Sequence, residues 1–150
     1  HETIGYNYRL SNVSAAIGCA QMEELDWRVK RRRAIHGIYA DALRDNPVVS
    51  VHTNPDDTFN SNYWLSTILL DDASPVSADD LRQKLASHNI ETRLLWRPMH
   101  MQPVYKDAPA YVNGVSERLF AHGLCLPSST TLSDEQIQHV AQLINRYTAL

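Results

Sequence analysis

The sequence predicts an α+β fold in which a long N-terminal helix leads into a small, mostly antiparallel sheet with helices on one face. Three observations predict it. Apolar residues recur every three or four positions over the first third of the chain, which is the pattern of an amphipathic helix. Short runs rich in β-branched and aromatic residues follow. These runs alternate with segments that carry helix-capping signals, and this order of elements favours a layered α+β domain.

Length and composition suit one compact domain, since 43% of the 150 residues are hydrophobic and 21% are charged. The formal net charge of −3 argues against nucleic-acid binding. No apolar run approaches the length of a membrane helix, which needs about 20 residues.

Two cysteines, Cys19 and Cys125, lie far apart, so we expect two buried thiols in a reducing compartment, the cytoplasm. The chain begins at His1 rather than at a methionine, so we expect it to be a piece of a longer protein.

The helical pattern begins at Ser11 or Asn12, either of which can cap a helix. It is expected to continue to Asn46 and Pro47, because proline prevents a helix from continuing. A single helix over this range would be about 50 Å long at 1.5 Å per residue. Gly37 is the expected position of a kink or of close packing. A helix of this length exceeds one small core, so we expect it to span two domains or a subunit interface.

Beyond the proline, the sequence predicts four short strands and three more helices. Ser77 can form a reciprocal capping box with Asp80. Ser133 can form a second one with Gln136. Gly123 is expected to take the left-handed conformation that ends the helix before it. The expected strands are 48–52, 63–70, 91–96 and 124–126, and the expected helices are 77–89, 113–123 and a last one from 133.

The opening segment 5–9, Gly-Tyr-Asn-Tyr-Arg, leads directly into the start of the long helix. A helix N-terminus carries free N–H groups and about half a positive charge, so it favours anions. Asn7 adds an amide donor, and Arg9 adds a guanidinium that can form two hydrogen bonds to a phosphate or carboxylate. The segment is therefore a candidate anion site. In the alternative interpretation, Tyr6 and Tyr8 pack, the asparagine forms a turn and the arginine is solvated.

A second candidate is the segment 97–105, Arg-Pro-Met-His-Met-Gln-Pro-Val-Tyr, which belongs to an irregular stretch, 97–111, with three prolines. Irregular stretches of this length in compact domains are usually functional or disordered, and the methionines and tyrosines argue against disorder. His100 lies between two methionines and can donate to a phosphate or relay a proton. The alternative is a surface imidazole in a packed loop.

The remaining polar clusters favour structural roles. The run 30–33, Lys-Arg-Arg-Arg, lies in mid-helix with Asp26 four residues before Lys30, which indicates a solvated helix face. The other histidines show no metal-ligand spacing. The sequence contains neither a glycine-rich phosphate loop nor a nucleophile elbow.

Three blocks of the sequence stand in a characteristic order. The most specific is 5–18, GYNYRLSNVSAAIG, and it is followed by 97–105, RPMHMQPVY, and 123–137, GLCLPSSTTLSDEQI. Together they resemble the C-terminal part of the PLP-dependent sugar aminotransferases of the DegT/DnrJ/EryC1/StrS family, over essentially the whole chain. Ser129 departs from the resemblance, because many relatives have glycine there. A turn that demanded positive φ at this serine would be strained.

The resemblance implies the fold of the C-terminal domain of aspartate-aminotransferase-type enzymes. It also implies transfer of an amino group, usually from glutamate, to a nucleotide-linked keto-sugar. The implied cofactor is pyridoxal 5′-phosphate (PLP), bound mainly by a large domain upstream of this chain and linked there to a lysine. None of Lys30, Lys84 and Lys106 matches that position, so we expect no catalytic residue in this chain and no activity from it alone. Residues 1–46 would form an active-site loop and an interdomain helix, and residues 47–150 the small C-terminal domain.

The family builds its active site at a homodimer interface, and this implies roles for five residues. Asn7 is expected to reach the PLP phosphate of the other subunit. Arg9 is expected near the nucleotide diphosphate or the carboxylate of the amino donor. His100 is expected to line the sugar-nucleotide pocket of the neighbouring subunit, and Tyr6 and Tyr8 to shape the same wall.

Two alternatives remain. One is a PLP-type sugar dehydratase of the same family, in which a histidine replaces the upstream lysine. The other is a non-catalytic α+β module that dimerises through its long helix.

Overall fold

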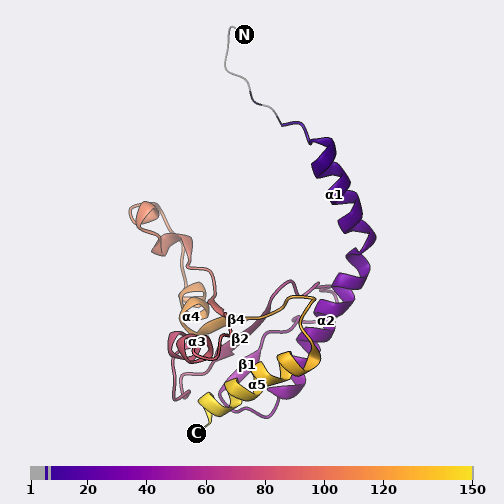
Figure 1. Cartoon of the computed structure of the whole chain (residues 1–150). Helices are drawn as coiled ribbons and strands as arrows, with labels where there is room; N and C mark the ends of the chain where they lie inside the picture. Colours follow the sequence, from indigo (N-terminus) through magenta and orange to yellow (C-terminus); the bar gives the residue numbers. More distant parts are fainter. Residues whose placement is uncertain (1–5, 7, 150) are drawn as a thin grey trace.

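A helical arm and a sheet-containing body make up the molecule (Figure 1). The structure is a computed structural model that describes residue 6 and residues 8–149. The arm is formed by α1 (Asn12–Glu23) and α2 (Leu25–Ala42). The predicted α+β class is confirmed. The body contains β1 (Val49–Val51), β2 (Ser66–Leu70), α3 (Ala78–Ala86), β3 (Arg93–Leu94), the short 3₁₀ helices η1 (Met99–Met101) and η2 (Pro103–Tyr105), α4 (Val115–His122), β4 (Gly123–Leu126) and α5 (Asp134–Thr148).

The predicted single long helix is two helices. Ser11 caps α1, as expected, since its side chain accepts a hydrogen bond from the backbone N–H of Ser14 at 3.1 Å. The interruption falls at Glu24, whose φ of −97° and ψ of −2° lie near the bridge region rather than at helical values of about −63° and −42°. The predicted kink at Gly37 is wrong. This glycine lies within α2, and a Cβ atom there would meet no other atom within 4 Å.

The sheet has the strand order β1-β2-β4-β3, and each pair of neighbouring strands is antiparallel. In the central strand β2, Ile68 lies opposite Leu124 of β4, while Leu70 lies opposite Val49 of β1. These four side chains are buried in the core. The short strands follow from the short β-branched runs, and tertiary pairing decides that β3 keeps only two residues.

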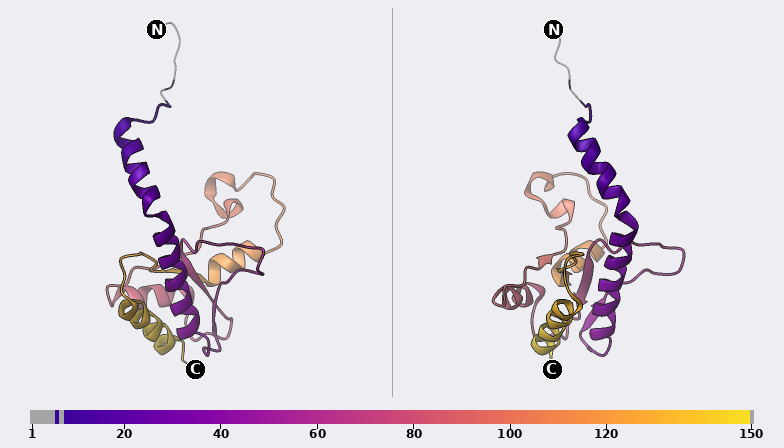
Figure 2. Two further views of the ribbon diagram at one scale, coloured as in Figure 1. Left: turned by 90° about the vertical axis from the view of Figure 1, so that its right-hand side faces the viewer. Right: turned by 45° about the vertical axis from the view of Figure 1, so that its right-hand side comes forward.

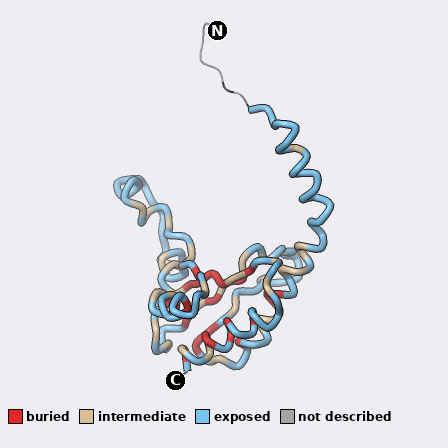
Figure 3. Tube along the Cα trace, in the orientation of Figure 1, coloured by how far each residue is buried: buried red, intermediate tan, exposed pale blue. Residues whose placement is uncertain are grey.

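One hydrophobic core lies between this sheet face and α2, α3 and α5 (Figure 3). The side chains that contribute most to it are fully buried, and each helix provides them at three- or four-residue spacing. They are Ile35 and Tyr39 of α2, Leu81 and Leu85 of α3, and Ile137, Ile144 and Ala141 of α5.

Helix α4 lies at the face of the sheet opposite the core, a placement that the sequence did not predict. Ser50 and Leu69 alternate with the core residues Val49 and Leu70, so they point away from the core. A cavity of about 360 Å³ separates them from α4, with Leu119 among its lining residues.

Both predicted capping boxes are confirmed. At α3, the hydroxyl of Ser77 accepts from the backbone N–H of Asp80 at 3.1 Å, and at α5 the hydroxyl of Ser133 accepts from that of Gln136 at 3.3 Å. Each capping residue also has its own backbone N–H bound by the side chain three positions later. The two helix starts are therefore set by local sequence.

The predicted left-handed conformation of Gly123 is wrong. Gly123 has a φ of −96° and a ψ of 142°, which is extended backbone, because α4 passes directly into β4 without a left-handed residue between them. The left-handed glycine is Gly114, whose φ is 81°, at the start of α4. Among the described non-glycine residues, only Tyr63 and Asn89 have positive φ, so the turn at Ser129 does not demand positive φ and the serine fits there.

The two cysteines differ in their surroundings. Cys125 is buried in β4, as expected, and burial raises the pKa of its thiol. Cys19 is exposed on α1, which contradicts the prediction, because α1 buries none of its residues. No helix in the described part of the chain combines the length and apolar character needed to cross a bilayer.

The predicted solvated face at 30–33 is wrong for its arginines, which bind the body of the molecule. Arg31 donates to the carboxylate of Asp134 at 2.7 Å. Arg32 donates to the backbone carbonyls of Trp64 and Ser128. Of the four residues, Lys30 alone has no such partner among the described contacts and is exposed. Three further hydrogen bonds join Arg28 to Thr130, and Arg33 to Ser61 and Asn60.

His36 connects α2 to the long 52–65 loop, and it makes stability depend on pH. The imidazole is buried and stacks on Tyr63, with ring centroids 3.7 Å apart and ring planes 9° apart. Burial, and secondarily the charge of nearby His52, lower the pKa of His36. In the unfolded chain His36 binds a proton more readily than in the native state. The free energy of unfolding is therefore undiminished above the ordinary histidine pKa of about 6.5 and decreases as the pH falls below it.

We therefore expect the free energy of unfolding to decrease between about pH 7.5 and about pH 5. The measurement is urea denaturation at both pH values for the wild-type chain and for His36→Phe, which keeps a flat ring against Tyr63. The decrease should be smaller in the variant. Equal decreases in the two proteins would show that His36 does not cause it.

Candidate functional site

The N-terminal segment presents its aromatic groups outward. Tyr6 and Tyr8 are 79% and 90% exposed, and their ring centroids lie 5.9 Å apart. Arg9 is also exposed. Asn7, the predicted phosphate ligand, lies outside the described residues. Three of the four predicted groups of this segment are therefore exposed just before the start of α1, where another molecule can reach them.

Helix α1 carries this segment away from the body (Figures 1 and 2). None of its 12 residues is buried. Its apolar side chains are exposed: those of Val13, Ile17 and Met22 are between 60% and 70% exposed, and that of Leu10, just before the helix, is 72% exposed. An isolated helix of about 12 residues is marginal in water, and most helices are stabilised by packing of an apolar face. The described residues provide no surface that covers the apolar side chains of α1.

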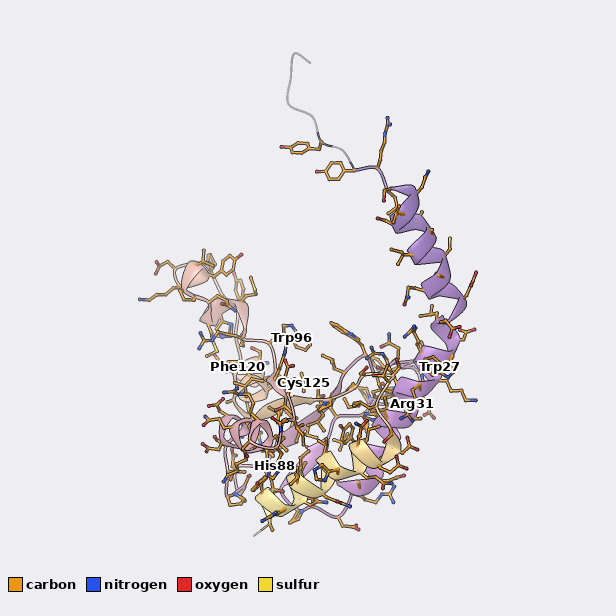
Figure 4. All side chains as sticks on the ribbon, viewed as in Figure 1. Trp27, Arg31, His88, Trp96, Phe120 and Cys125 are labelled. Atoms are coloured by element: carbon orange, nitrogen blue, oxygen red, sulfur yellow. The ribbon has the colours of Figure 1, made fainter. Side chains whose placement is uncertain are left out.

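The second predicted segment forms a loop that projects from the body between β3 and α4. The turns η1 and η2 give it local structure, and its aromatic and methionine side chains remain largely exposed. His100 is half-buried within it, and its Nε2 lies 2.8 Å from Oε1 of Glu117 in α4. Arg97, at the base of the loop, lies with its guanidinium carbon 5.5 Å from the ring centroid of Phe120. This phenylalanine also belongs to α4, and Figure 4 labels it.

A cavity of about 330 Å³ lies beside His100. Met99, Tyr105 and Tyr111 are among its other lining residues. The site combines one imidazole, held by a carboxylate, with apolar and aromatic walls. Such an arrangement can hydrogen bond to a hydroxyl or phosphate while the rings pack against a flat ligand.

The arm and the loop are separate projections within one chain, so the structure does not bring the predicted residues together. Figure 1 shows α1 and the 97–112 loop extending from different sides of the body. Tyr6, Tyr8 and Arg9 lie at one end and His100 at the other. One chain alone does not complete a site from these groups.

Sequence reasoning missed Glu117 as a partner of His100. It is 17 residues away, and its position in the first turn of α4 indicates only a helix-stabilising charge. Sequence reasoning also missed a cavity of about 700 Å³ beside β3, β4 and α5. Its lining includes Thr92, whose buried hydroxyl has no hydrogen-bond partner among the described residues. None of the predicted site residues lines this cavity.

The family comparison agrees with the three sequence blocks. The family model described as the DegT/DnrJ/EryC1/StrS aminotransferase family matches residues 1–145. The chain belongs to this family. Its members are PLP-dependent aminotransferases.

Several relatives in the DegT/DnrJ/EryC1/StrS family match nearly the whole chain. EpsN of Bacillus subtilis (strain 168) is 40% identical over 149 residues, which is 96% of this chain and 37% of that protein. GDP-perosamine synthase of Escherichia coli O157:H7 is 38% identical, over 98% of this chain and 39% of the synthase. The chain thus spans about two fifths of the length of these relatives, and it matches their C-terminal portion.

Solved structures agree with the fold. The crystal structure of DesI in the presence of its TDP-sugar product superposes with a TM-score of 0.83, at 27% sequence identity, over 91% of this chain and 35% of DesI. The PLP form of the sugar aminotransferase Spr1654 from Streptococcus pneumoniae has a TM-score of 0.87 at 19% identity, over 98% of this chain and 38% of that chain, which shows the shared fold.

The described residues do not fit the covalent anchor of PLP. Such an anchor is a lysine held in a cavity, with donors for the phosphate nearby. Lys30, Lys84 and Lys106 are all exposed, and none lines the cavities beside His100 or β3. Lys84 instead lies with its Nζ 5.1 Å from the ring centroid of Tyr147. The residues described also bring together no group of three His, Cys, Asp or Glu side chains that could hold a metal ion.

Proposed function

We propose that this chain is the C-terminal part of a PLP-dependent aminotransferase that transfers an amino group from glutamate to a nucleotide-linked keto-sugar. The observation that carries the proposal is the arm. Helix α1 buries no residue and leaves the apolar side chains of Val13, Ile17 and Met22 exposed, which favours a covering surface outside the described residues. A large cofactor domain and a second subunit supply that surface. GDP-perosamine synthase and the TDP-sugar complex of DesI support a nucleotide-sugar substrate.

The proposed assembly is a homodimer in which each chain completes the site of the other. Asn7 donates to the PLP phosphate of the partner, and Arg9 binds an anionic group of the nucleotide sugar or of glutamate. His100 lines the sugar-nucleotide pocket, with Tyr6 and Tyr8 in the same wall. The separation of arm and loop in one chain supports this division, because residues on opposite projections meet only across an interface.

Residues 1–46 are then the active-site loop and the interdomain connection, and residues 47–150 are the small domain with its own core. The arginines of α2 support a fixed angle between the two parts, since they bind carbonyls and carboxylates of the body. We place the enzyme in the cytoplasm, because the exposed free thiol of Cys19 suits a reducing compartment.

When bound, PLP supplies the electron sink that makes amino transfer possible. The residues of this chain contribute binding and orientation. Asn7 and Arg9 bind anionic groups, which keeps the charged ends of cofactor and substrate in place. The aromatic walls beside His100 exclude water from the sugar, and the imidazole hydrogen bonds to it. The chain itself holds no covalent intermediate in this proposal.

The proposal predicts separate effects for the two projections in the longer enzyme. Asn7→Ala should raise the dissociation constant of PLP by about tenfold or more, because a hydrogen bond to a charged group contributes about 1.5–3 kcal/mol. His100→Ala should chiefly raise the KM for the nucleotide sugar. Equilibrium titration with PLP and steady-state kinetics measure the two constants.

Lys106→Ala is the matched control for the loop, since this exposed lysine follows η2 and lies outside the cavity beside His100. It should leave both constants unchanged. If neither Asn7→Ala nor His100→Ala changes its constant by about twofold, the proposed roles are wrong.

A further inference from the structure

We infer that Glu117 is the positioning residue for His100, and that α4 is the support that holds the substrate-facing loop in place. The inference rests on the proposed function, because it deepens the role of His100 as a substrate-binding group. It concerns a residue that does not itself face the substrate in the proposal. Glu117 acts on substrate only through the imidazole.

The contact between the two side chains is direct. Nε2 of His100 lies 2.8 Å from Oε1 of Glu117, which is a strong hydrogen-bond distance. The side chains are 21% and 41% exposed, so the pair is partly shielded from water. A carboxylate only accepts hydrogen bonds, so the imidazole donates through Nε2–H. In the neutral ring this leaves Nδ1 as the acceptor, available for a hydroxyl group in the adjacent cavity.

A second contact runs parallel to the first. The guanidinium of Arg97 lies over the ring of Phe120. Arg97 is three residues before His100 in the loop, and Phe120 is three residues after Glu117 in the helix. Residues three apart lie on one face of a helix, so Glu117 and Phe120 face the loop together. The start of the loop is therefore held at two points along α4. Two points fix its direction, whereas one would leave it free to rotate.

Helix α4 is a firm support for these contacts. Just before the helix, the side-chain oxygen of Asn113 accepts from the backbone N–H of Val115, the first helical residue, at 3.2 Å. The last residue of α4 leads without a break into the buried strand β4. Glu117 lies in the first turn of α4, where the helix dipole stabilises a negative charge. The helix thus holds the Glu117 side chain beside the imidazole of His100.

The first test detects the hydrogen bond itself. In the chain labelled with ¹⁵N-histidine, the Nε2–H proton of His100 should be visible by NMR because the bond slows its exchange with water; the signal is assigned by its absence in His100→Ala. It should be lost in Glu117→Ala. It should persist in Glu135→Gln, a matched control that removes a first-turn charge from α5 instead. Survival of the signal in Glu117→Ala would overturn the inference.

The second test is a double-mutant cycle in the longer enzyme. Glu117→Ala should raise the KM for the nucleotide sugar by about three- to tenfold, within the range of couplings between residues in contact, and should leave the dissociation constant of PLP unchanged. In the His100→Ala background the same change should have no further effect on KM. If Glu117 had only a structural role, Glu117→Ala would raise the KM by the same factor in the His100→Ala background, and this result would overturn the inference.

Glu117→Gln keeps the size of the side chain and guards against loss of folding in the alanine variant. Its KM should lie between those of the wild-type and alanine variants, with an unchanged circular-dichroism spectrum. If His100→Ala leaves the KM unchanged, the proposed role of His100 is wrong and the inference falls with it. If His100→Ala raises the KM but neither Glu117 variant does, the inference alone is overturned.

Discussion

Replacing Gly123 by alanine is expected to destabilise the fold by about 2–4 kcal/mol, because there is no room for a side chain at the junction of α4 and β4. A Cβ atom at this position would lie 2.5 Å from the backbone carbonyl oxygen of Leu119 and would also overlap the side chain of Leu95. The side chain of Leu95 can rotate, but the carbonyl belongs to α4 and moves only with the helix. Chemical denaturation of the 150-residue chain measures the effect.

Gly37→Ala is the matched control for this prediction. It lies inside α2, and a Cβ atom there would meet nothing within 4 Å. Alanine should stabilise α2 by about 0.5–1 kcal/mol, since glycine has the greater backbone entropy in the unfolded chain. If the two substitutions changed stability by similar amounts, the role of close packing at Gly123 would be disproved.

Arg32→Ala is expected to destabilise the chain by about 2–4 kcal/mol, because the guanidinium donates to two backbone carbonyls, those of Trp64 and Ser128. These carbonyls precede β2 and follow β4, so one side chain joins α2 to two neighbouring strands of the sheet. Hydrogen bonds from charged donors contribute about 1.5–3 kcal/mol each, and the half-exposed position of Arg32 reduces the sum.

Lys30→Ala tests whether contact rather than charge matters. Both substitutions remove one positive charge from the same helix, but the exposed Lys30 makes none of the described contacts to the body. Its replacement should change the free energy of unfolding by no more than about 0.5 kcal/mol. A comparable loss in both variants would mean that net charge, not the two carbonyl contacts, stabilises α2 against the sheet.

The local elements of this fold could be predicted because their signals lie within a few residues. Ser77 with Asp80 and Ser133 with Gln136 each satisfy the free backbone groups of one helix start, whatever the rest of the chain does. The conformation of Gly123 could not be predicted in this way. A glycine after a helix usually supplies a left-handed cap, but here the approach of α4 to β4 requires the missing side chain.

The candidate site shows the same division. The type and spacing of residues around His100 predicted a functional loop, and the resemblance in three blocks predicted the family, which is confirmed. The partner of His100 could not be predicted, because Glu117 becomes its neighbour only when α4 folds back along the loop. How His100 and Arg9 lie relative to each other in the proposed site could not be predicted either, since the arm and the loop of one chain extend from different sides of the body.

By itself, the sequence determined the family, the α+β class, the starts of α1, α3 and α5 and the core-facing stripe of α5, since each depends on the identity of residues close together along the chain. Only the tertiary structure decided what the arginines of α2 bind, why Gly123 must lack a side chain and which carboxylate holds His100. These contacts join residues that are between 4 and 103 positions apart. Most of these contacts depend on the path that the backbone takes between the two residues, and no local sequence pattern predicts that path.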